Sequence, residues 1–318
     1  MTTPQTLIEA VRQLADPDVC LDLMVTMRWP DGVTCPTCGS KEVRFIRTRR
    51  IWECKTKHTK RQFSVKVGTI FEDSPIALDK WLIGMWLIAN AKNGISSYEL
   101  AKDLGVTQTT AWFMLQRIRL AMQDDGIGPF SGKVEVDETF IGGKARFMHK
   151  AKRTETIIGT GGMGKTAVMG LLERHGSDEE ASRVRTKVVA DRRRKSLSSE
   201  VRKHVVSGSE VFTDALKSYD DLGIDYVHQV IDHAESYVKG QIHTNGIENF
   251  WSLLKRAIRG TYVSVEPFHL FRYLDEETFR FNTRETNDGD RFQTVARGVS
   301  GKRLTYAQLI GATNTTPA

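Results

Sequence analysis

The stretch that decides the fold reads Lys133-Val-Glu-Val-Asp-Glu-Thr-Phe-Ile141, a short run of β-branched and apolar residues with Asp137 at its centre. Such a run predicts a strand, and an isolated carboxylate within it would be costly to bury unless it were paired or held a metal ion. A second run of this kind, Glu210-Val-Phe-Thr-Asp214, ends on another carboxylate. The two runs therefore predict neighbouring strands of one sheet, each carrying an acidic side chain.

A third carboxylate, Glu248, opens the amphipathic segment 244–256, which reads Thr-Asn-Gly-Ile-Glu-Asn-Phe-Trp-Ser-Leu-Leu-Lys-Arg. Lys255 follows Glu248 by seven residues, so both would project from one face of a helix. Hard cations such as Mg²⁺ are bound by one or two carboxylates together with substrate phosphates, and a pair of ions can clamp the oxygens of a phosphoryl displacement. Asp137, Asp214 and Glu248 are thus candidate ligands of Mg²⁺ or Mn²⁺ in an enzyme that cuts or joins a nucleic-acid strand.

Each of these carboxylates also has an ordinary explanation. An Asp at the end of a strand is often a turn or cap residue, and a Glu in the first turn of a helix is favoured by the helix dipole. Glu135 and Glu138 flank Asp137 and are expected, by period-two alternation, to lie on the opposite face of the strand from it, which makes them poorer ligand candidates. Three carboxylates in order, joined by Lys255, favour the metal site.

The sequence around the three carboxylates resembles that of one family. VEVDETFIGG (134–143), VFTDALKSY (211–219) and HTNGIENFWSLLKRAIRGTY (243–262) resemble bacterial insertion-sequence transposases with an N-terminal zinc ribbon. Their order is similar to that in DDE transposases and integrases, whose RNase-H-like domain carries two Asp on strands and a Glu on a later helix. The resemblance implies metal-dependent strand cleavage at element ends and strand transfer into target DNA. It also implies double-stranded DNA as the partner and a homo-oligomer assembled on it.

The resemblance leaves two residues open as the third metal ligand. Transposases of this kind can carry Asn where other DDE enzymes have the third acid, and Asn245 lies one turn before Glu248. We favour Glu248, because an ionised carboxylate binds a hard cation better than an amide does. Asn245 and His243 are then auxiliary residues of the site. Lys255 and Arg259, on the same helix face as Glu248, are expected to hold DNA phosphates near the cut.

The composition describes an ordinary globular protein with room for two or three domains. It has 318 residues, of which 40% are hydrophobic and 27% charged. It lacks an apolar run long enough to span a bilayer, and the start, Met1–Gln5, does not resemble a signal peptide. We therefore expect a cytoplasmic protein without a membrane partner.

The positive charge of the chain fits a polyanionic partner. The net charge is +7, and residues 41–66 hold ten Lys and Arg against two acidic residues. Residues 183–203 hold nine against two, including the run Arg192–Lys195. A solvated surface would explain either run alone, but Phe45, Trp52 and Phe63 are interleaved with the first and favour nucleic acid there.

Four residues predict a zinc site. Cys35-Pro-Thr-Cys38 is followed by Cys54 and His58, a spacing typical of a small tetrahedral zinc centre. A redox role for the CxxC motif would need a βαβ context that is missing, and disulfides do not suit a cytoplasmic chain. His58 is the ligand that the pattern supports least, because the resembling family often has Cys in this region. Cys20 lies outside the pattern and is expected to be a buried free thiol.

Residues 96–119 predict a helix-turn-helix. Ser96 or Ser97 would cap a short helix that ends at Gly105, and Thr107 would cap a second helix. Two helices joined by a Gly-containing turn are typical of DNA-binding domains, in which residues early in the second helix contact base edges. The residues expected in that position are Gln108, Thr109 and Thr110. Those expected on the core face are Trp112, Leu115, Ile118 and Met122.

Two other functions compete with transposition. Residues 159–166, Gly-Thr-Gly-Gly-Met-Gly-Lys-Thr, match the phosphate-binding pattern GxxxxGK[ST] of NTPases, which requires a strand before the motif and a helix after it. Thr166–Arg174 suits a core strand at least as well as a helix, so an NTPase is the weaker interpretation. A DNA-binding regulator with an inactive nuclease fold is the other, and the retained carboxylates and Lys255 argue against it.

The whole chain is therefore expected to be a multidomain α+β or α/β protein. The expected order is a helical segment (1–30), a zinc ribbon (31–67), a helix-turn-helix domain (76–125), an RNase-H-like DDE domain (130–285) and a flexible tail (286–318). Before the DDE domain we expect strands at 42–53 and 62–66, a linker at 68–75 and a helix at 78–91. Within it we expect strands at 133–141, 166–174, 184–190, 210–214 and 226–231, and helices at 196–206, 244–259 and 265–284, in a mixed sheet with helices on both faces.

Overall fold

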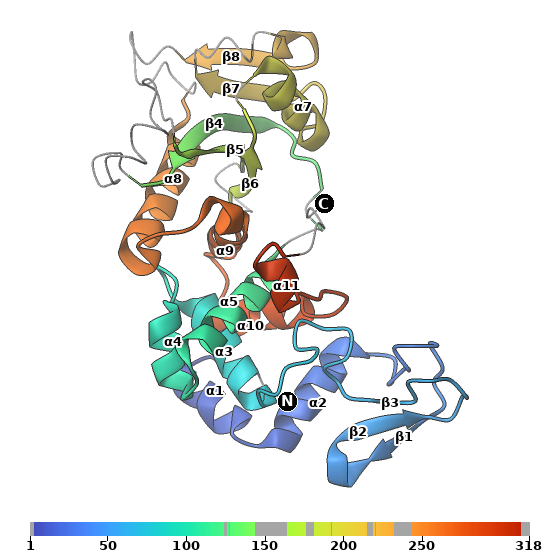
Figure 1. Ribbon diagram of the computed structural model, residues 1–318. Helices are drawn as coiled ribbons and strands as arrows, with labels where there is room; N and C mark the ends of the chain where they lie inside the picture. The colour runs from blue at the N-terminus through green and yellow to red at the C-terminus, as the bar shows by residue number, and fades with distance from the viewer. Residues whose placement is uncertain are drawn as a thin grey trace. The chain divides into compact units, whose positions relative to one another are not determined.

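A computed structural model divides the chain into two compact units (Figure 1). Unit 1 comprises residues 1–123 and 286–318, and unit 2 comprises residues 124–285. The structure describes residues 3–123, 126, 128–143, 164–175, 181–191, 193–214, 219, 221–231 and 243–312. None of the helices in that part of the chain has the length and apolar character that crossing a membrane requires.

Unit 1 begins with two helices and a small antiparallel sheet. The helices are α1 (Leu7–Leu14) and α2 (Pro17–Arg28), and the sheet has the order β1 (Val43–Ile46), β2 (Ile51–Cys54), β3 (Gln62–Phe63). The predicted strand 42–53 is two strands, because the chain turns at Arg50, which has a left-handed φ of 51°.

Aromatic residues form the core of this small sheet. The Trp52 ring lies 5.0 Å from that of Phe45, 6.1 Å from that of Phe63 and 5.6 Å from that of Trp29. Trp52 and Phe63 are buried, whereas Phe45 is 43% exposed. Two of the three interleaved aromatic residues therefore supply the core of a very small domain, and only Phe45 is exposed on this basic stretch.

Three further helices follow, α3 (Leu78–Asn90), α4 (Ser97–Leu104) and α5 (Gln108–Met122). The predicted caps are confirmed, since the Ser96 and Thr107 side chains accept hydrogen bonds from the N–H groups of Glu99 and Thr110. Gly105 ends α4 in the left-handed conformation, with φ 59°. On α5 the predicted core residues Leu115, Ile118 and Met122 are buried, but Trp112 is only half-buried, and Ala111 and Met114 are buried instead.

Two segments that were expected to be loosely held are built into unit 1. Residues 286–312 contain α10 (Asp288–Arg297) and α11 (Tyr306–Leu309), and Phe292 is fully buried with its ring 5.6 Å from that of Trp86. In the expected linker, Ile70 and Phe71 are fully buried. The buried Arg117 guanidinium joins both segments to α5, because it donates to the carbonyl oxygens of Ile70, Glu72 and Leu304.

Unit 2 is a mixed five-stranded sheet of order β6-β5-β4-β7-β8, flanked by helices as expected (Figure 1). β4, β5 and β6 are antiparallel, while β4, β7 and β8 are parallel. The strands are β4 (Lys133–Ile141), β5 (Thr166–Arg174), β6 (Arg183–Val189), β7 (Glu210–Asp214) and β8 (Val227–Ile231). The helices are α7 (Arg194–His204), α8 (Asn245–Ala257) and α9 (Leu270–Asn282).

The two faces of the sheet carry different helices. Val134 and Val136 of β4 pack with Leu197 and Val201 of α7, whereas α8 and α9 form a second core with Val168 and Leu172 of β5. Side chains alternate along a strand, so the odd-numbered residues of β4, Asp137 among them, face α8. In α9, Leu274, Phe279 and Phe281 are buried, whereas Phe268 precedes the helix and is 47% exposed.

The glycine-rich motif is followed by a strand. Residues 159–163 lie outside the described part of the chain, but Thr166 opens β5, which pairs with β4 along its whole length. A phosphate-binding loop needs a helix at that position. The NTPase interpretation is therefore not favoured. Of the basic run 192–195, Arg192 also lies outside the described residues, and the other three side chains are exposed at the start of α7.

Candidate functional site

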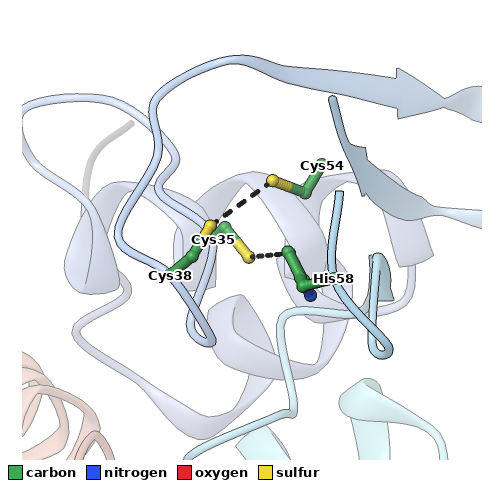
Figure 2. A group of neighbouring side chains, drawn as sticks. All are labelled: Cys35, Cys38, Cys54 and His58. Atoms are coloured by element: carbon green, nitrogen blue, oxygen red, sulfur yellow. Dashed lines mark hydrogen bonds between the residues drawn. The ribbon is translucent and has the colours of Figure 1, made fainter. Parts of the chain in front are cut away.

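The zinc ligands predicted from the sequence come together in unit 1 (Figure 2). Cys35 and Cys38 precede β1, Cys54 ends β2 and His58 lies between β2 and β3. Sγ of Cys35 is 3.4 Å from Nε2 of His58, Sγ of Cys38 is 3.6 Å from Sγ of Cys54, and all four ligand atoms lie within 4.8 Å of one another. Ligand atoms of a tetrahedral zinc lie about 3.6–3.8 Å apart. The group, including His58, thus fits a structural Zn²⁺.

The surroundings of Cys35 favour the thiolate that zinc requires. Burial of its thiol works against ionisation, but hydrogen bonds with the N–H groups of Cys38 and Thr37 and with the thiols of Cys38 and Cys54 together lower the pKa of Cys35 to about 7. Cys20, by contrast, is a buried free thiol as predicted, and burial raises the pKa of Cys20 to about 11. Cys35 therefore differs from Cys20 in electrostatics as well as in place.

Strand pairing brings the first two carboxylates of unit 2 to the same level. In the parallel pair of β4 and β7, Val134 lies opposite Val211 and Glu135 opposite Phe212. The same register, continued by two residues, aligns Asp137 with Asp214. Neighbouring strands are about 4.8 Å apart, and aligned residues of parallel strands point to the same face. Both carboxylates therefore face α8, which carries Glu248.

Helix α8 runs alongside β4 in the same direction, and two hydrogen bonds join them at matching intervals. The N–H of Ile247 donates to Glu135 Oε2 at 2.8 Å, and Nε1 of Trp251 donates to Asp137 Oδ2 at 3.0 Å. Four helical residues rise about 6 Å and two strand residues about 6.6 Å, so the two contacts match. Glu248 lies between these contacts in sequence, is exposed, and accepts a hydrogen bond from the Thr244 hydroxyl at 3.0 Å. Asn245, the first residue of α8, is also exposed.

The pKa of Asp137 is affected by the other two carboxylates. Burial, together with the negative charges of Asp214 and Glu248, raises the pKa of Asp137 to about 6. Bringing a divalent cation to this site would relieve that crowding of charge. Within the described part of the chain, only the zinc-ribbon group is a compact cluster of three or more candidate ligands. Asp137, Asp214 and Glu248 do not form such a compact cluster.

Glu135 holds the start of α8 in place. Its side chain is 1% exposed. The carboxylate accepts a hydrogen bond from Ile247 N–H and another, at 2.6 Å, from Nε of Arg174. The Arg174 guanidinium in turn lies 4.4 Å from the Phe212 ring. The prediction that Glu135 faces away from Asp137 was wrong, because residues two apart share a face of a strand. Glu138 does face away, and there the Tyr219 hydroxyl donates to it. Sequence reasoning missed this role, although the available signal was a Glu inside the predicted strand, two residues before Asp137.

Gly170 of β5 makes room for the Trp251 ring. It pairs with Asp137, and a Cβ at this position would lie 2.6 Å from the indole and 2.7 Å from the Ile247 side chain. No real side chain tolerates such a distance without movement. The hydrogen bond from Trp251 to Asp137 therefore depends on a glycine in the neighbouring strand.

We predict that Gly170→Ala destabilises unit 2 by about 1–3 kcal/mol, the usual cost of overpacking a core. The indole must move, so the orientation of Asp137 is lost as well. Urea unfolding followed by tryptophan fluorescence measures the cost. Gly223→Ala is the matched control, because nothing lies within 4 Å of a Cβ there. Equal stability of the two variants would contradict the close packing of α8 on the sheet.

Two cations lie beyond the carboxylates on the C-terminal side of α8. Lys255 is half-buried, and burial and the charges of Arg259 and Lys165 lower the pKa of Lys255, while the charge of Asp137 opposes that change. Arg259 lies in η5 (Ile258–Tyr262), one turn of π-helix that continues α8, and is exposed. Of the two predicted phosphate-binding residues, Lys255 is thus close enough to Asp137 for their charges to interact.

The predicted base-reading residues begin α5. Thr109 is exposed, whereas Gln108 and Thr110 are half-buried. The Gln108 side-chain amide donates to the Ser97 hydroxyl at 2.7 Å, and the hydroxyls of Thr110 and Thr107 are 2.8 Å apart. Thr109 is therefore the best placed of the three for contact with a partner, and the other two also support the turn.

Two family models and two relatives match parts of this chain. The family model of the transposase zinc-ribbon domain matches residues 16–57, one residue short of His58, and that of the ISXO2-like transposase domain matches residues 129–282. A protein described as uncharacterized in transposable element ISH50 of Halobacterium salinarum is 29% identical over 254 residues, which cover 74% of this chain and 81% of that protein. An uncharacterized transposase-like protein of Haemophilus influenzae is 33% identical over 104 residues, 32% of this chain and 84% of that protein.

Proposed function

This chain belongs to the family of insertion-sequence transposases that join a zinc ribbon to an ISXO2-like transposase domain, and we propose that it is a DDE-type transposase. In this proposal it cuts DNA at the ends of its own element and joins those ends to target DNA. The observation that carries the proposal is the register of β4 and β7, which aligns Asp137 with Asp214 on the face covered by α8. Glu248 comes from that helix.

The proposal includes an RNase-H-like fold for the catalytic domain, residues 130–285. Its support is the order of the sheet, three consecutive antiparallel strands followed by two parallel strands, with helices on both faces. The domain before it, residues 76–125, is proposed to be a DNA-binding helix-turn-helix, supported by the capped helices α4 and α5 and the tight turn at Gly105.

Each residue of the site has a distinct task in this proposal. Asp137, Asp214 and Glu248 would hold Mg²⁺ or Mn²⁺, and a bound ion would supply a nucleophilic oxygen and stabilise the leaving oxygen. Trp251 orients Asp137 through its hydrogen bond, and Glu135 fixes the start of α8. Lys255 and Arg259 would neutralise phosphate near the cut, which positions the strand. Asn245, exposed one turn before Glu248, is an auxiliary residue beside the ions.

The experiment that tests the proposal is a cleavage assay with the full chain and duplex DNA taken from the borders of the element that encodes it. Nicks at the element ends that require Mg²⁺ or Mn²⁺, and that form without ATP, would support a DDE transposase. Specific binding without cleavage under any metal condition would favour the regulator instead. A requirement for ATP, lost in Lys165→Ala, would favour the NTPase.

The two kinds of DNA contact are expected to respond differently to substitution. Thr109→Ala should change which end sequences bind best, at a cost of about 1–3 kcal/mol on the preferred site, because the residue is proposed to touch a base edge. Arg259→Ala should lower cleavage of every sequence alike and reduce the salt slope of binding by about one unit, because it holds a phosphate. Competition binding with variant ends and a salt titration measure both effects. Uniform weakening by Thr109→Ala would move base recognition elsewhere, and the basic zinc ribbon would be the next candidate.

A further inference from the structure

A cavity of about 290 Å³ lies in unit 2, where α8 passes into η5 at the end of β4. Its lining includes the apolar residues Ile141, Ile258, Val263 and Val265. The lining also includes the cations Lys255 and Arg259. Among the described residues that line the cavity, none is acidic. Such a lining suits a ligand that has both an apolar part and an anionic part.

The cavity continues the row of carboxylates. α8 and β4 run side by side, with Trp251 in contact with Asp137. Lys255 is one helical turn, about 6 Å, beyond Trp251, and Ile141 is four strand residues, about 13 Å, beyond Asp137. If the cleaved phosphate of a DNA strand lies at the carboxylates, the nucleotide one or two positions from the cut would therefore lie at the cavity.

The wall of the cavity is held in a strained conformation. Val263, a β-branched residue, has φ 61° and ψ −54°, and the Ser264 N–H donates to the Tyr262 carbonyl oxygen across it at 2.6 Å. The Tyr262 hydroxyl donates to the buried Glu276 carboxylate, and its ring lies 4.8 Å from that of Tyr273. A strained residue costs about 1–3 kcal/mol and persists where the structure around it fixes it, often at a ligand clamp. Val263 is nevertheless 78% exposed, so burial of its own side chain does not explain the strain.

We propose that this cavity binds one unpaired nucleotide of the DNA strand that enters the carboxylate site. Its base would lie against the apolar wall and its phosphate against Lys255 and Arg259. A volume near the lower limit for ligand pockets, about 300 Å³, admits one nucleotide and not a duplex. Taking a base out of a duplex requires an apolar surface in exchange for its stacking partners, which the exposed Val263 at the rim offers. The proposal rests on the proposed function, because it needs a DNA strand at the carboxylates.

Base unpairing can be measured directly with the full chain. Border duplexes are made with 2-aminopurine at one position at a time, and fluorescence is recorded with protein in the absence of Mg²⁺. An increase at a single position within two nucleotides of the cut is expected. A flat profile from protein that cleaves the same DNA when Mg²⁺ is added would overturn the cavity proposal and leave the transposase intact. Absence of cleavage by the wild-type protein would instead contradict the proposed function.

Filling the cavity gives a second test. Ser264 is exposed beside the cavity, so Ser264→Trp should occlude it and lower cleavage about ten- to a hundredfold, the loss expected for one base contact, whereas Ser264→Ala should not. An abasic residue at the fluorescent position should restore cleavage by Ser264→Trp, because no base then needs the cavity. Failure of the abasic DNA to restore cleavage would overturn the proposal.

Val263→Gly keeps the proposal testable if Ser264→Trp does not fold. Glycine accepts a positive φ without strain, so the melting temperature of the Val263→Gly variant should equal or exceed that of the wild type. The 2-aminopurine signal of its complex with DNA should fall. An unchanged signal would count against the proposal. A third outcome would also overturn the proposal. If free deoxynucleoside monophosphate bound the wild type but not Ser264→Trp, and no base unpairing was seen in DNA, the cavity would serve free nucleotides.

Discussion

Asp137→Ala is expected to abolish DNA cleavage, lowering the rate by a factor on the order of 10³ or more, as removal of a central catalytic group commonly does. The residue lies at the level of Asp214 on the neighbouring strand and accepts a hydrogen bond from Trp251, so it would hold the metal and not read bases. Binding to the element ends should therefore stay close to that of the wild type. Cleavage of border DNA and a gel-shift titration, performed on the same preparation, measure the two effects.

The same result is expected for Asp214→Ala and Glu248→Ala, and the matched control is Glu138→Gln. Glu138 is adjacent to Asp137 in sequence, but it faces the other side of the sheet, where it accepts from Tyr219. Its substitution should leave cleavage largely intact. If Glu248→Ala kept wild-type cleavage while Asn245→Ala lost it, Asn245 would be the third residue of the site.

Loss of activity in Asp137 variants should not come from unfolding. Burial and the like charges of Asp214 and Glu248 disfavour the ionised form of Asp137, which is why its pKa is raised to about 6. An amide of nearly the same shape avoids that cost at neutral pH. Asp137→Asn is therefore expected to melt no lower than the wild type while losing cleavage, a separation of stability from function typical of active sites.

Most of unit 2 could be predicted because its strands and helices are marked by local periodicity. The predicted strands 133–141, 166–174 and 210–214 are found with these bounds, and α8 starts and ends within two residues of its prediction. Hydrophobic alternation carries that information within each segment. The neighbouring positions of β4 and β7 followed from the expected topology.

The contacts that build the site were harder to predict, because each joins residues far apart in the chain. Nothing near Gly170 indicates that it must accommodate Trp251, since the two meet only after α8 packs on the sheet. The tail was misjudged for the same reason. Its polar composition hides the few apolar residues, Phe292 among them, that complete the core of unit 1. Composition averages over a segment, whereas burial depends on which face of a helix meets a partner.

Removal of zinc is expected to unfold roughly residues 30–66 and to weaken specific binding to the element ends. The sheet of β1, β2 and β3 has a small aromatic core, so the ligand bonds supply most of its folding energy, as in other small zinc domains. Binding of Zn²⁺ to such sites contributes on the order of 10–16 kcal/mol, far more than so few buried side chains can replace. Chelation, Cys35→Ser and His58→Ala should each have this effect.

Elemental analysis and tryptophan fluorescence measure the loss, since Trp29 and Trp52 lie in this core. Cys20→Ala is the matched control, because that thiol is buried but lies outside the cluster, so zinc content should not change. His58→Ala is the sharpest variant, since the family match ends at residue 57 and His58 is assigned by its position beside Cys35. The sheet of unit 2 contains none of the ligands, so its unfolding transition should remain. A zinc-free protein in which the sheet of β1, β2 and β3 stayed folded and end binding stayed intact would contradict the zinc assignment. Three thiols and an imidazole would then hold that small domain together without a metal.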